Sequence, residues 1–566
     1  MKTNCQNCKK DFDITKNDLG FYEKIKVPSP TFCPECRMIR RMAWRNERHL
    51  HKNKCDICKE NIISIYSEDS PYKVLCGSCF HGDAWNPFDY EMEIDFSKPF
   101  LQQVKELQLK VPRLYSFVFQ NTNSEYTNGA AFNKNCYLIF VSDYDEDCAY
   151  CYSTTNSKNS LDLFNSTENE LCYDSSSCVK CFAVSFSEDC ASSQNLIFCK
   201  NCNNCSDCIG CVNLRNKKHC LFNEQLTEEE YKQKKKELNL ENRESLKSLE
   251  KQAREVWSKY PLKYIHGLKN IDVMGDYTNN SKNSSFVFDS NSVEDSKFLN
   301  FGSKIKDSQD AYVLVDGSEL CNEIVSGITL SNAKCSYCVW VGFNISYSDT
   351  CENSNNLFGC VGVRKGEYCI LNKKYSKEEY EQLVEKIIKH MNDMPYVDEK
   401  GIVYKYGEFF PIDLSPFSYN ETIAQEYFPL EEKEALEKGY RWMKKKERDY
   451  KIEIKSEEIP QEIEGVGEDI VNKVIECAHK GDCNHQCTEA FRIRKSDFDF
   501  YKRLKLPLPD LCPNCRHTKR FKTHNPLQFW ERGCMNKGCQ NKFKTTYSPD
   551  RPEVVYCESC YQKEVY

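Results

Sequence analysis

The residues with the clearest chemistry are cysteines, which occur in closely spaced pairs near both ends of the chain. Two thiolates separated by two residues can bind one metal ion from a tight turn, and Zn²⁺ prefers four ligands in a tetrahedron. Joining neighbouring pairs predicts four structural zinc ions per chain. The predicted ligand sets are Cys5, Cys8, Cys33 and Cys36; Cys55, Cys58, Cys76 and Cys79; Cys483, Cys487, Cys512 and Cys515; and Cys534, Cys539, Cys557 and Cys560.

Two of these pairs depart from the two-residue spacing. Three residues separate Cys483 from Cys487, and four separate Cys534 from Cys539. Because zinc sites often mix cysteine and histidine, His479 or His485 could replace Cys483 as a ligand. Cys477 has no predicted partner and is interpreted as a spare thiol. Four-thiolate sites leave no open coordination position, so hydrolytic zinc chemistry is not expected.

The composition favours metal binding over a disulfide framework. The 566 residues include 36 cysteines, and the first residues lack the apolar segment of a secretory signal. We therefore predict a cytoplasmic protein with reduced thiols, with disulfides as the alternative if the chain is secreted by another route. The mean hydropathy is −0.68 and the chain lacks a long apolar run, which predicts no membrane span. The net charge of −7 argues against general coating of nucleic acid.

The two ends read as copies of one module. The gap from Cys8 to Cys33 equals that from Cys487 to Cys512, and each second cysteine begins a Cys-Pro-x-Cys-Arg motif. Between the pairs, the motifs Thr15-x-x-Asp18 and Ser496-x-x-Asp499 are each expected to open a short helix. A further helix is expected to start near the last cysteine of each set, which gives a treble-clef-like or zinc-ribbon arrangement.

The middle of the chain is also duplicated. Residues 209–231 align without a gap to residues 358–380. Asn, Asp, Ser and Cys recur at intervals of about twelve residues and precede short aromatic or aliphatic segments, a pattern typical of a β-solenoid. The alternative is an irregular Cys-rich sheet domain. The predicted fold class is thus multidomain and mainly β, with tandem four-cysteine zinc modules at both termini flanking two duplicated β-solenoid-like repeats with helical linkers.

Capping boxes mark two helices that follow the repeats. Thr227-x-x-Glu230 and Ser376-x-x-Glu379 each pair a hydroxyl with a carboxylate three residues on, which satisfies backbone N–H groups at a helix start. These signals complete a predicted domain order. The segments are 1–105, a double zinc module; 106–226, solenoid repeat 1; 227–260, a charged helical linker; 261–394, solenoid repeat 2 with a capping helix; 395–470, an aromatic linker followed by a charged helix; and 471–566, a second double zinc module.

One run of cysteines raises a different chemistry. Every third residue from Cys199 to Cys211 is cysteine, a pattern similar to iron–sulfur ligation. In the internal copy these positions include Ser348, Ser354 and Leu357, which could not hold a cluster. Buried core thiols are therefore the favoured interpretation. An iron–sulfur or thiol-redox protein stays the alternative function, because the first repeat could still bind a metal by itself.

Basic residues follow the last cysteine of the first and third sets. Together with Trp44, they could contact phosphates and stack on bases, as in proteins that bind single strands or RNA. The alternative is a helix whose arginines orient the zinc-bound thiolates. The candidate nucleic-acid contacts are Arg37, Arg40, Arg41, Arg45, Arg516, Lys519 and Arg520.

The segment from Cys487 through DFDFYKRLKLPLPDLCPNCR resembles zinc-ribbon domains, and PDRPEVVYCESCYQKE (549–564) is similar to another small ribbon. With GEFFP, YNETIAQE and GYRW, nearly the whole chain resembles Cys-rich zinc-ribbon proteins of candidate-phyla bacteria. That resemblance implies zinc modules and no particular activity. The chain also lacks a Gly-rich phosphate loop, GxSxG and HExxH. The function predicted is a non-enzymatic zinc-binding scaffold that contacts RNA, DNA or protein, with a membrane partner or small-molecule substrate not expected.

Overall fold

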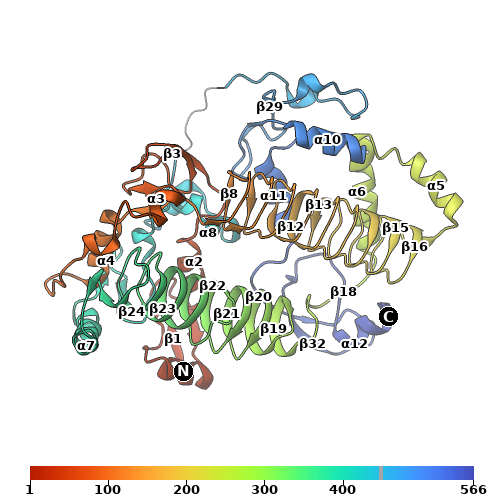
Figure 1. The fold of residues 1–566 in the computed structure, drawn as a ribbon. Helices are drawn as coiled ribbons and strands as arrows, with labels where there is room; N and C mark the ends of the chain where they lie inside the picture. The colour runs from red at the N-terminus through yellow and green to blue at the C-terminus, as the bar shows by residue number, and fades with distance from the viewer. Residues whose placement is uncertain (445–449, 566) are drawn as a thin grey trace. The chain divides into compact units, whose positions relative to one another are not determined.

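A computed structural model describes residues 1–444 and 450–565, and it is mainly β. The chain divides into two compact units, each built from two separate segments (Figure 1). Unit 1 comprises Met1–Ser116 and Ile265–Lys444, and unit 2 comprises Phe117–Tyr264 and Lys445–Tyr566. Each unit therefore joins one terminal cysteine module to one stretch of the central chain. Part of the charged helix predicted within 395–470, residues 445–449, lies outside the described residues.

Unit 2 contains a β-solenoid of parallel strands, which confirms the solenoid interpretation over the irregular sheet. Strand pairing advances by twelve residues per turn, as in Tyr152↔Phe164 and Gln194↔Ser206. The strands are short because each turn bends again within a few residues. They are β7 (Val118–Phe119), β8 (Thr127–Asn128), β9 (Ala130–Ala131), β10 (Ile139–Phe140), β11 (Tyr152–Thr155), β12 (Leu161–Thr167), β13 (Tyr173–Ser176), β14 (Gln194–Ile197), β15 (Ser206–Ile209) and β16 (Lys218–Leu221).

The backbone turns at almost every third residue. Asp147, Tyr150, Ser153, Asn156 and Asn159 all have φ between 47° and 60°, the left-handed region. Asparagine and aspartate tolerate this region better than other non-glycine residues, which explains why they recur through the repeats. Their side chains also form ladders along the solenoid: the Nδ2 of Asn123 donates to Asn135, and the Nδ2 of Asn135 donates to Asp147, each at 3.0 Å.

We call the residues in the left-handed region the corners of the solenoid. The residue that follows each corner points into a narrow core. The core of unit 2 is formed by thiols with a few aliphatic side chains, and Cys199, Cys202 and Cys208 are fully buried. Each inward thiol donates to the carbonyl two residues earlier, as Cys199 does to Ile197 at 3.6 Å. The core thiols therefore donate hydrogen bonds to backbone carbonyls of the tight turns.

One column of inward side chains joins successive turns through hydrogen bonds. Asn133 Oδ1 accepts the N–H of Asp145, Asp145 Oδ1 accepts the N–H of Ser157, and both distances are 2.8 Å. Farther along, Asn169 Oδ1 accepts the N–H of Cys181 at 3.0 Å. These side-chain oxygens thus provide hydrogen-bond acceptors for buried backbone N–H groups of the next turn.

Unit 1 contains a solenoid with longer strands and a more aliphatic core, including Val287, Leu299 and Ile324. Its turns are also about twelve residues long, with an offset of eleven between Ile271 and Lys282 and of thirteen between Gln309 and Asn322. The strands are β19 (Ile271–Asn279), β20 (Lys282–Glu294), β21 (Lys297–Lys306), β22 (Gln309–Val315), β23 (Asn322–Ser346), β24 (Glu352–Phe358) and β25 (Glu367–Ile370).

Each solenoid ends in an antiparallel hairpin followed by a helix. In unit 2, β16 pairs with β17 (Glu224–Gln225) and α5 (Glu228–Glu237) follows; α6 (Arg243–Trp257) comes next. In unit 1, β25 pairs with β26 (Lys373–Lys374) and α7 (Lys377–Asp393) follows. The predicted capping boxes at Thr227/Glu230 and Ser376/Glu379 are confirmed.

The N-terminal cysteine module alternates hairpins and short helices. The module is followed by α4 (Phe100–Lys110), and the last part of unit 1 returns to pack beside α2 and includes α8 (Ile423–Tyr427) and α9 (Glu432–Glu437). The capping box at Thr15/Asp18 is confirmed. The module's elements are β1 (Lys2–Asn4), β2 (Asp11–Asp13), α1 (Lys16–Lys24), α2 (Pro34–Met42), β3 (His51–Lys54), β4 (Asn61–Ser64), β5 (Val74–Leu75) and α3 (Gly77–His81).

The C-terminal module has the same element order. Its first helix starts earlier than the sequence predicted, because Arg494 with Asp497 caps it instead of Ser496 with Asp499. The elements are β29 (Ile475–Glu476), β30 (Ala490–Phe491), α10 (Lys495–Leu504), α11 (Pro513–Phe521), β31 (Trp530–Gly533), β32 (Lys542–Thr545), β33 (Val555–Tyr556) and α12 (Glu558–Val565). Among the described residues, every helix is too short or too polar to cross a lipid bilayer.

The buried carboxyl of Asp145 makes the stability of unit 2 depend on pH. Burial raises its pKa from 3.8 to about 7, although bonds from Thr154 and Ser157 oppose the shift. In the unfolded chain the group loses its proton near pH 3.8, so between pH 4 and 7 only the folded state holds it. The raised pKa therefore favours folding most at low pH, and this contribution falls as pH rises toward 7.

We expect Asp145→Asn to flatten this dependence and to increase stability at pH 8. Asparagine already occupies the neighbouring inward positions Asn133 and Asn169, where it donates to a carbonyl and accepts an N–H. Urea unfolding followed by circular dichroism from pH 4 to 8 measures the effect. The exposed corner change Asp147→Asn is the control, and equal pH profiles for the two variants would contradict the prediction.

Candidate metal centres and their docking contacts

Five groups of cysteine and histidine side chains in the described part of the chain could hold a metal ion. In each group the ligand atoms all lie within 4.8 Å of one another. Three groups match the predicted sets that begin at Cys5, Cys55 and Cys534. The other two are Cys477, Cys487, Cys512 and Cys515; and His479, Cys483, His485 and Cys515.

The four all-cysteine groups share one hydrogen bond. The backbone N–H of the third cysteine donates to the sulfur of the first. This bond holds the second pair of cysteines, which we call the second knuckle, against the first pair, the first knuckle. Such bonds favour the thiolate form that a metal requires. The donor and acceptor pairs are Cys33 to Cys5 at 3.2 Å, Cys76 to Cys55 at 3.4 Å, Cys512 to Cys477 at 3.2 Å and Cys557 to Cys534 at 3.3 Å.

Local structure also lowers the pKa of selected thiols. Burial raises the pKa of Cys55, but N–H groups directed at its sulfur, led by that of Cys76, outweigh burial and lower the pKa to about 6. Burial likewise opposes the shift at Cys557, where bonds from Ser559 and Asn541 help to lower the pKa to about 5. These thiols are thus prepared to bind a cation near neutral pH.

The structure groups the third predicted set differently. Cys477, interpreted from the sequence as a spare thiol, joins Cys487, Cys512 and Cys515, and Cys483 does not belong to that group. The reason lies in the strands: Cys477 directly follows β29 as Cys5 directly follows β1, and both strands pair with the hairpin strand beyond the knuckle. The apolar residues Val474 and Ile475 were the signal for this strand.

Cys483 instead lies with two histidines. Its sulfur is 3.7 Å from that of Cys515, and the rings of His479 and His485 are 5.3 Å apart. The sequence identified both histidines only as substitutes within a single four-ligand site. The structure groups them with Cys483 and Cys515 around a separate position.

The cysteine run from Cys199 to Cys211 belongs to the solenoid core. These thiols are buried and donate to carbonyls of their own turns, as Cys205 does to Asn203 at 3.3 Å. They join none of the five groups found among the described residues. The core-thiol interpretation is thus the better fit, and the iron–sulfur alternative is not favoured.

The three arginines of α2 are buried, as is Arg45 just beyond the helix, contrary to the exposed basic face that the sequence suggested. Arg37 pairs with Asp310 at 3.0 Å, and Arg41 pairs with Asp310 at 3.0 Å and with Glu323 at 2.8 Å. Arg40 pairs with Glu323 at 2.6 Å and with Glu408 at 2.9 Å, and Arg45 pairs with Glu47 at 3.2 Å. Each of the four arginine side chains is only 2–3% exposed. Their positive charges are therefore neutralised inside unit 1.

In unit 2 the same contacts recur between α11 and the solenoid. Arg516 pairs with Asp162 at 3.0 Å, and Arg520 pairs with Asp162 at 2.8 Å and with Asp174 at 2.9 Å. Arg516 also donates to the Leu511 carbonyl, as Arg37 donates to that of Phe32. Lys519 differs, because it is 46% exposed and pairs with Glu250 at 3.2 Å. The two arginines thus dock the C-terminal cysteine module on its solenoid.

The acceptors of these pairs are corner residues. Asp162, Asp174, Asp310 and Glu323 all have φ between 43° and 59°, and each acidic pair lies on successive turns of its solenoid. A carboxylate in this position projects from the edge of a turn toward the docked helix. Local sequence patterns do not reveal this partnership, because Arg40 and Glu323 are 283 positions apart in the chain.

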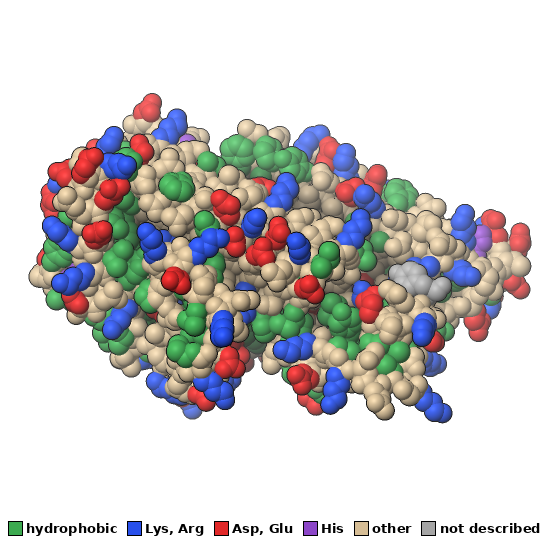
Figure 2. Space-filling view, turned by 90° about the horizontal axis from the view of Figure 1, so that it is seen from below, with side chains coloured by type: hydrophobic (Ala, Val, Ile, Leu, Met, Phe, Trp, Pro, Cys, Tyr) green, Lys and Arg blue, Asp and Glu red, His purple; other side chains and the backbone are tan. Residues whose placement is uncertain are grey.

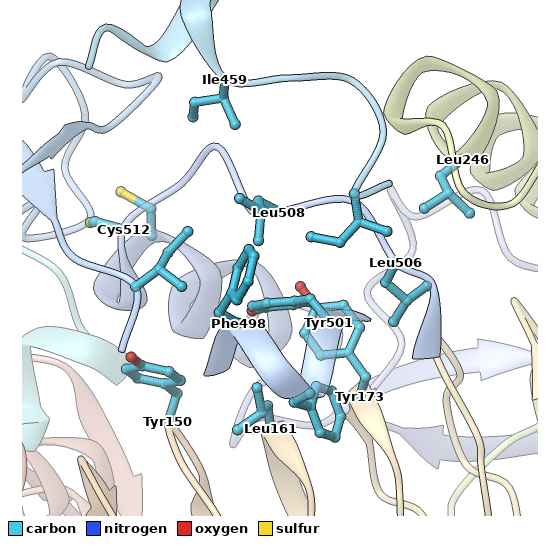
Figure 3. Packing of buried hydrophobic residues seen from close by; sticks show 14 of the residues in the cluster. Tyr150, Leu161, Tyr173, Leu246, Ile459, Phe498, Tyr501, Leu506, Leu508 and Cys512 are labelled. Carbon is cyan, nitrogen blue, oxygen red and sulfur yellow. The ribbon is translucent and has the colours of Figure 1, made fainter. Parts of the chain in front are cut away.

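Apolar contacts surround the docking pairs of unit 2. Tyr150, Leu161 and Tyr173 of the solenoid face Phe498 and Tyr501 of α10 (Figure 3). Leu246 of α6 and Leu506, Leu508 and Ile459 belong to the same cluster. In addition, Tyr150 donates to Asp497 at 2.7 Å, so the capping residue of α10 also contacts the solenoid.

Outside such contacts, Figure 2 shows Lys and Arg interspersed with Asp and Glu over the face in view.

Comparison with known proteins gives no family for the chain. No protein-family model matches it, and no curated protein matches it. Among solved structures, the chain is similar to a candidate acetyltransferase from Desulfovibrio desulfuricans G20, with 10% identity over 51% of this chain and 86% of that chain. The TM-score of that match is 0.09, which carries no argument about fold or activity. The resemblance to zinc-ribbon proteins stays a prediction supported by the four-cysteine groups.

Removing one docking carboxylate should destabilise its unit strongly. Asp162→Asn keeps the corner conformation but leaves Arg516 and Arg520 without their shared charge partner, and breaking a buried pair typically costs about 3–5 kcal/mol. Denaturant unfolding of the full chain measures the loss. The exposed corner change Asp147→Asn should cost less than about 1 kcal/mol. Equal effects of the two substitutions would show that the buried pairs do not stabilise docking.

Proposed function

We propose that this protein is a non-enzymatic scaffold in which zinc-bound modules are locked onto β-solenoids. The observation that carries the proposal is the pair of docking contacts, Arg37 and Arg41 with Asp310 and Glu323 in unit 1 and Arg516 and Arg520 with Asp162 and Asp174 in unit 2. In both units the arginines belong to the helix that begins at a ligand cysteine, Cys33 or Cys512. Metal binding and docking therefore act on the same helix.

Zinc fits the donor chemistry best. Clusters of four thiolates suit Zn²⁺ or iron, and four protein ligands around one ion are the usual arrangement of a structural zinc site. All 36 cysteines are free thiols, which agrees with a reducing compartment such as the cytoplasm. The matched docking contacts also support the proposal that the chain arose by duplication of one module-and-solenoid unit.

Zinc should be required for the folding of the terminal modules. Substituting Cys5 and Cys36 by alanine removes two ligands of the first site, so we expect the zinc content to fall by about one ion per chain, with loss of protection around α2. Elemental analysis of anaerobically purified protein and hydrogen exchange measure the two effects. The matched control is Cys220→Ala, a core thiol outside the five groups. Iron in place of zinc, or unchanged protection, would contradict the proposal.

A partner that binds the scaffold, RNA, DNA or protein, stays a prediction. The buried arginines are already paired with carboxylates, so a nucleic-acid contact would have to use exposed basic residues. Lys519 on α11 is such a residue, although it also pairs with Glu250.

A salt titration with RNA and DNA tests the nucleic-acid version. If α11 contacts phosphate through its exposed face, Lys519→Ala should weaken binding and reduce the salt slope by about one. Lys495→Ala, an exposed lysine on α10, is the control for net charge. Undetectable binding at low salt would rule out the nucleic-acid partner and leave protein partners.

A further inference from the structure

The C-terminal module differs from the N-terminal module by an insertion inside its first knuckle. Two residues separate Cys5 from Cys8, whereas nine residues, 478–486, separate Cys477 from Cys487. The framework around the insertion is unchanged. Cys477 and Cys5 each follow a paired strand and accept an N–H at 3.2 Å, from Cys512 and Cys33. The added loop is therefore not needed to build the four-cysteine site.

The inserted loop carries three further metal-binding side chains, His479, Cys483 and His485. Their ligand atoms lie within 4.8 Å of one another and of the Cys515 sulfur. The Nδ1 atoms of His479 and His485 are buried and have no hydrogen-bond partner among the described residues. A buried ring nitrogen without a partner is costly unless a ligand binds it.

Cys515 belongs to both groups. Its sulfur is 3.9 Å from that of Cys477 in the first group and 3.7 Å from that of Cys483 in the second. In the N-terminal module the equivalent sulfur, that of Cys36, accepts a hydrogen bond from the Asn7 amide at 3.3 Å. Beside Cys515, the second group takes the place of that amide, and a thiolate has enough lone pairs to bind two cations.

We propose that the C-terminal module holds a binuclear metal cluster bridged by the Cys515 thiolate. One ion is bound by Cys477, Cys487, Cys512 and Cys515. The second is bound by His479, Cys483, His485 and the same Cys515 sulfur, so each ion has four ligands. The inference rests on the proposed zinc scaffold and raises the expected zinc content from about four to about five per chain.

The charges of the cluster agree with two ions. A single Zn²⁺ among the five thiolates would leave about three units of negative charge, whereas a second Zn²⁺ reduces this to about one unit. Binding at Nδ1 leaves the proton of His485 on Nε2, so Nε2 no longer accepts from Lys522 at 3.0 Å. Lys522 is exposed and can turn toward solvent.

The second ion has a more open site than the first. His479, Cys483 and His485 are half-buried, whereas Cys477, Cys487 and Cys512 are buried. The half-buried ion should therefore exchange with solution faster than the buried one. It should also be lost first to a chelator, while the arginine contacts of α11 persist.

A loop replacement tests the inference on the full chain. Replacing residues 478–486 by Gln-Asn restores the spacing between Cys5 and Cys8, and the double variant His479→Ala/Cys483→Ala removes two ligands without shortening the chain. Both should lower the zinc content from about five to about four ions per chain and leave the denaturant midpoint of unfolding unchanged. His219→Ala, a histidine outside the five groups, should keep about five.

Cadmium substitution tests the bridge directly. In ¹¹³Cd NMR of the cadmium-loaded chain, a shared thiolate should couple two resonances, and the coupling should vanish in both loop variants. About four ions in both wild-type and variant protein would overturn the second site but leave the scaffold intact. Five ions without coupling would overturn the bridge, and a wild-type chain without zinc would overturn the scaffold itself.

Discussion

A backbone that bends at almost every third residue depends on left-handed residues at its corners. That constraint determines much of the rest of the structure. It favours Asn and Asp at the corners, whose amides form ladders from turn to turn, as between Asn123 and Asn135. It also keeps the interior narrow, and in the solenoid of unit 2 thiols with a few aliphatic side chains fill it. Because the thiols hydrogen-bond to the turn itself, the narrow core tolerates their polarity.

The same corners create the docking sites for the cysteine modules. A carboxylate at a corner, such as Asp162 or Asp310, points outward from the turn and meets an arginine of a docked helix. Burying these charges is costly unless they are paired, so such contacts contribute more to the choice of docking position than to net stability. A helix placed one turn away would lose the present pairing, in which Arg516 contacts Asp162 and Arg520 contacts both Asp162 and Asp174. The pairs therefore define the register of module and solenoid.

Local patterns in the sequence were enough to predict the solenoid and most ligands, but not the contacts between distant segments. The twelve-residue period is visible because corner residues are chemically restricted, and the capping boxes at Thr227 and Ser376 are local signals. Arg37 and Arg41 are buried because they pair with carboxylates that are distant in the sequence. Local patterns therefore predicted an exposed basic helix. Cys477 was missed because spacing alone selected the nearer Cys483.

The metal sites and the docking contacts are coupled through one short helix. In α11, Cys512 is the N-cap, Cys515 lies in the first turn, and Arg516 and Arg520 project toward the solenoid. A helix of nine residues has little stability in isolation, so the ion pairs along its length hold it in place, and a metal bound at its first turn would do the same. By linkage, whatever stabilises docking also tightens metal binding. A second ion on Cys515 would act at the same turn, which connects an inserted surface loop to the packing of the whole unit.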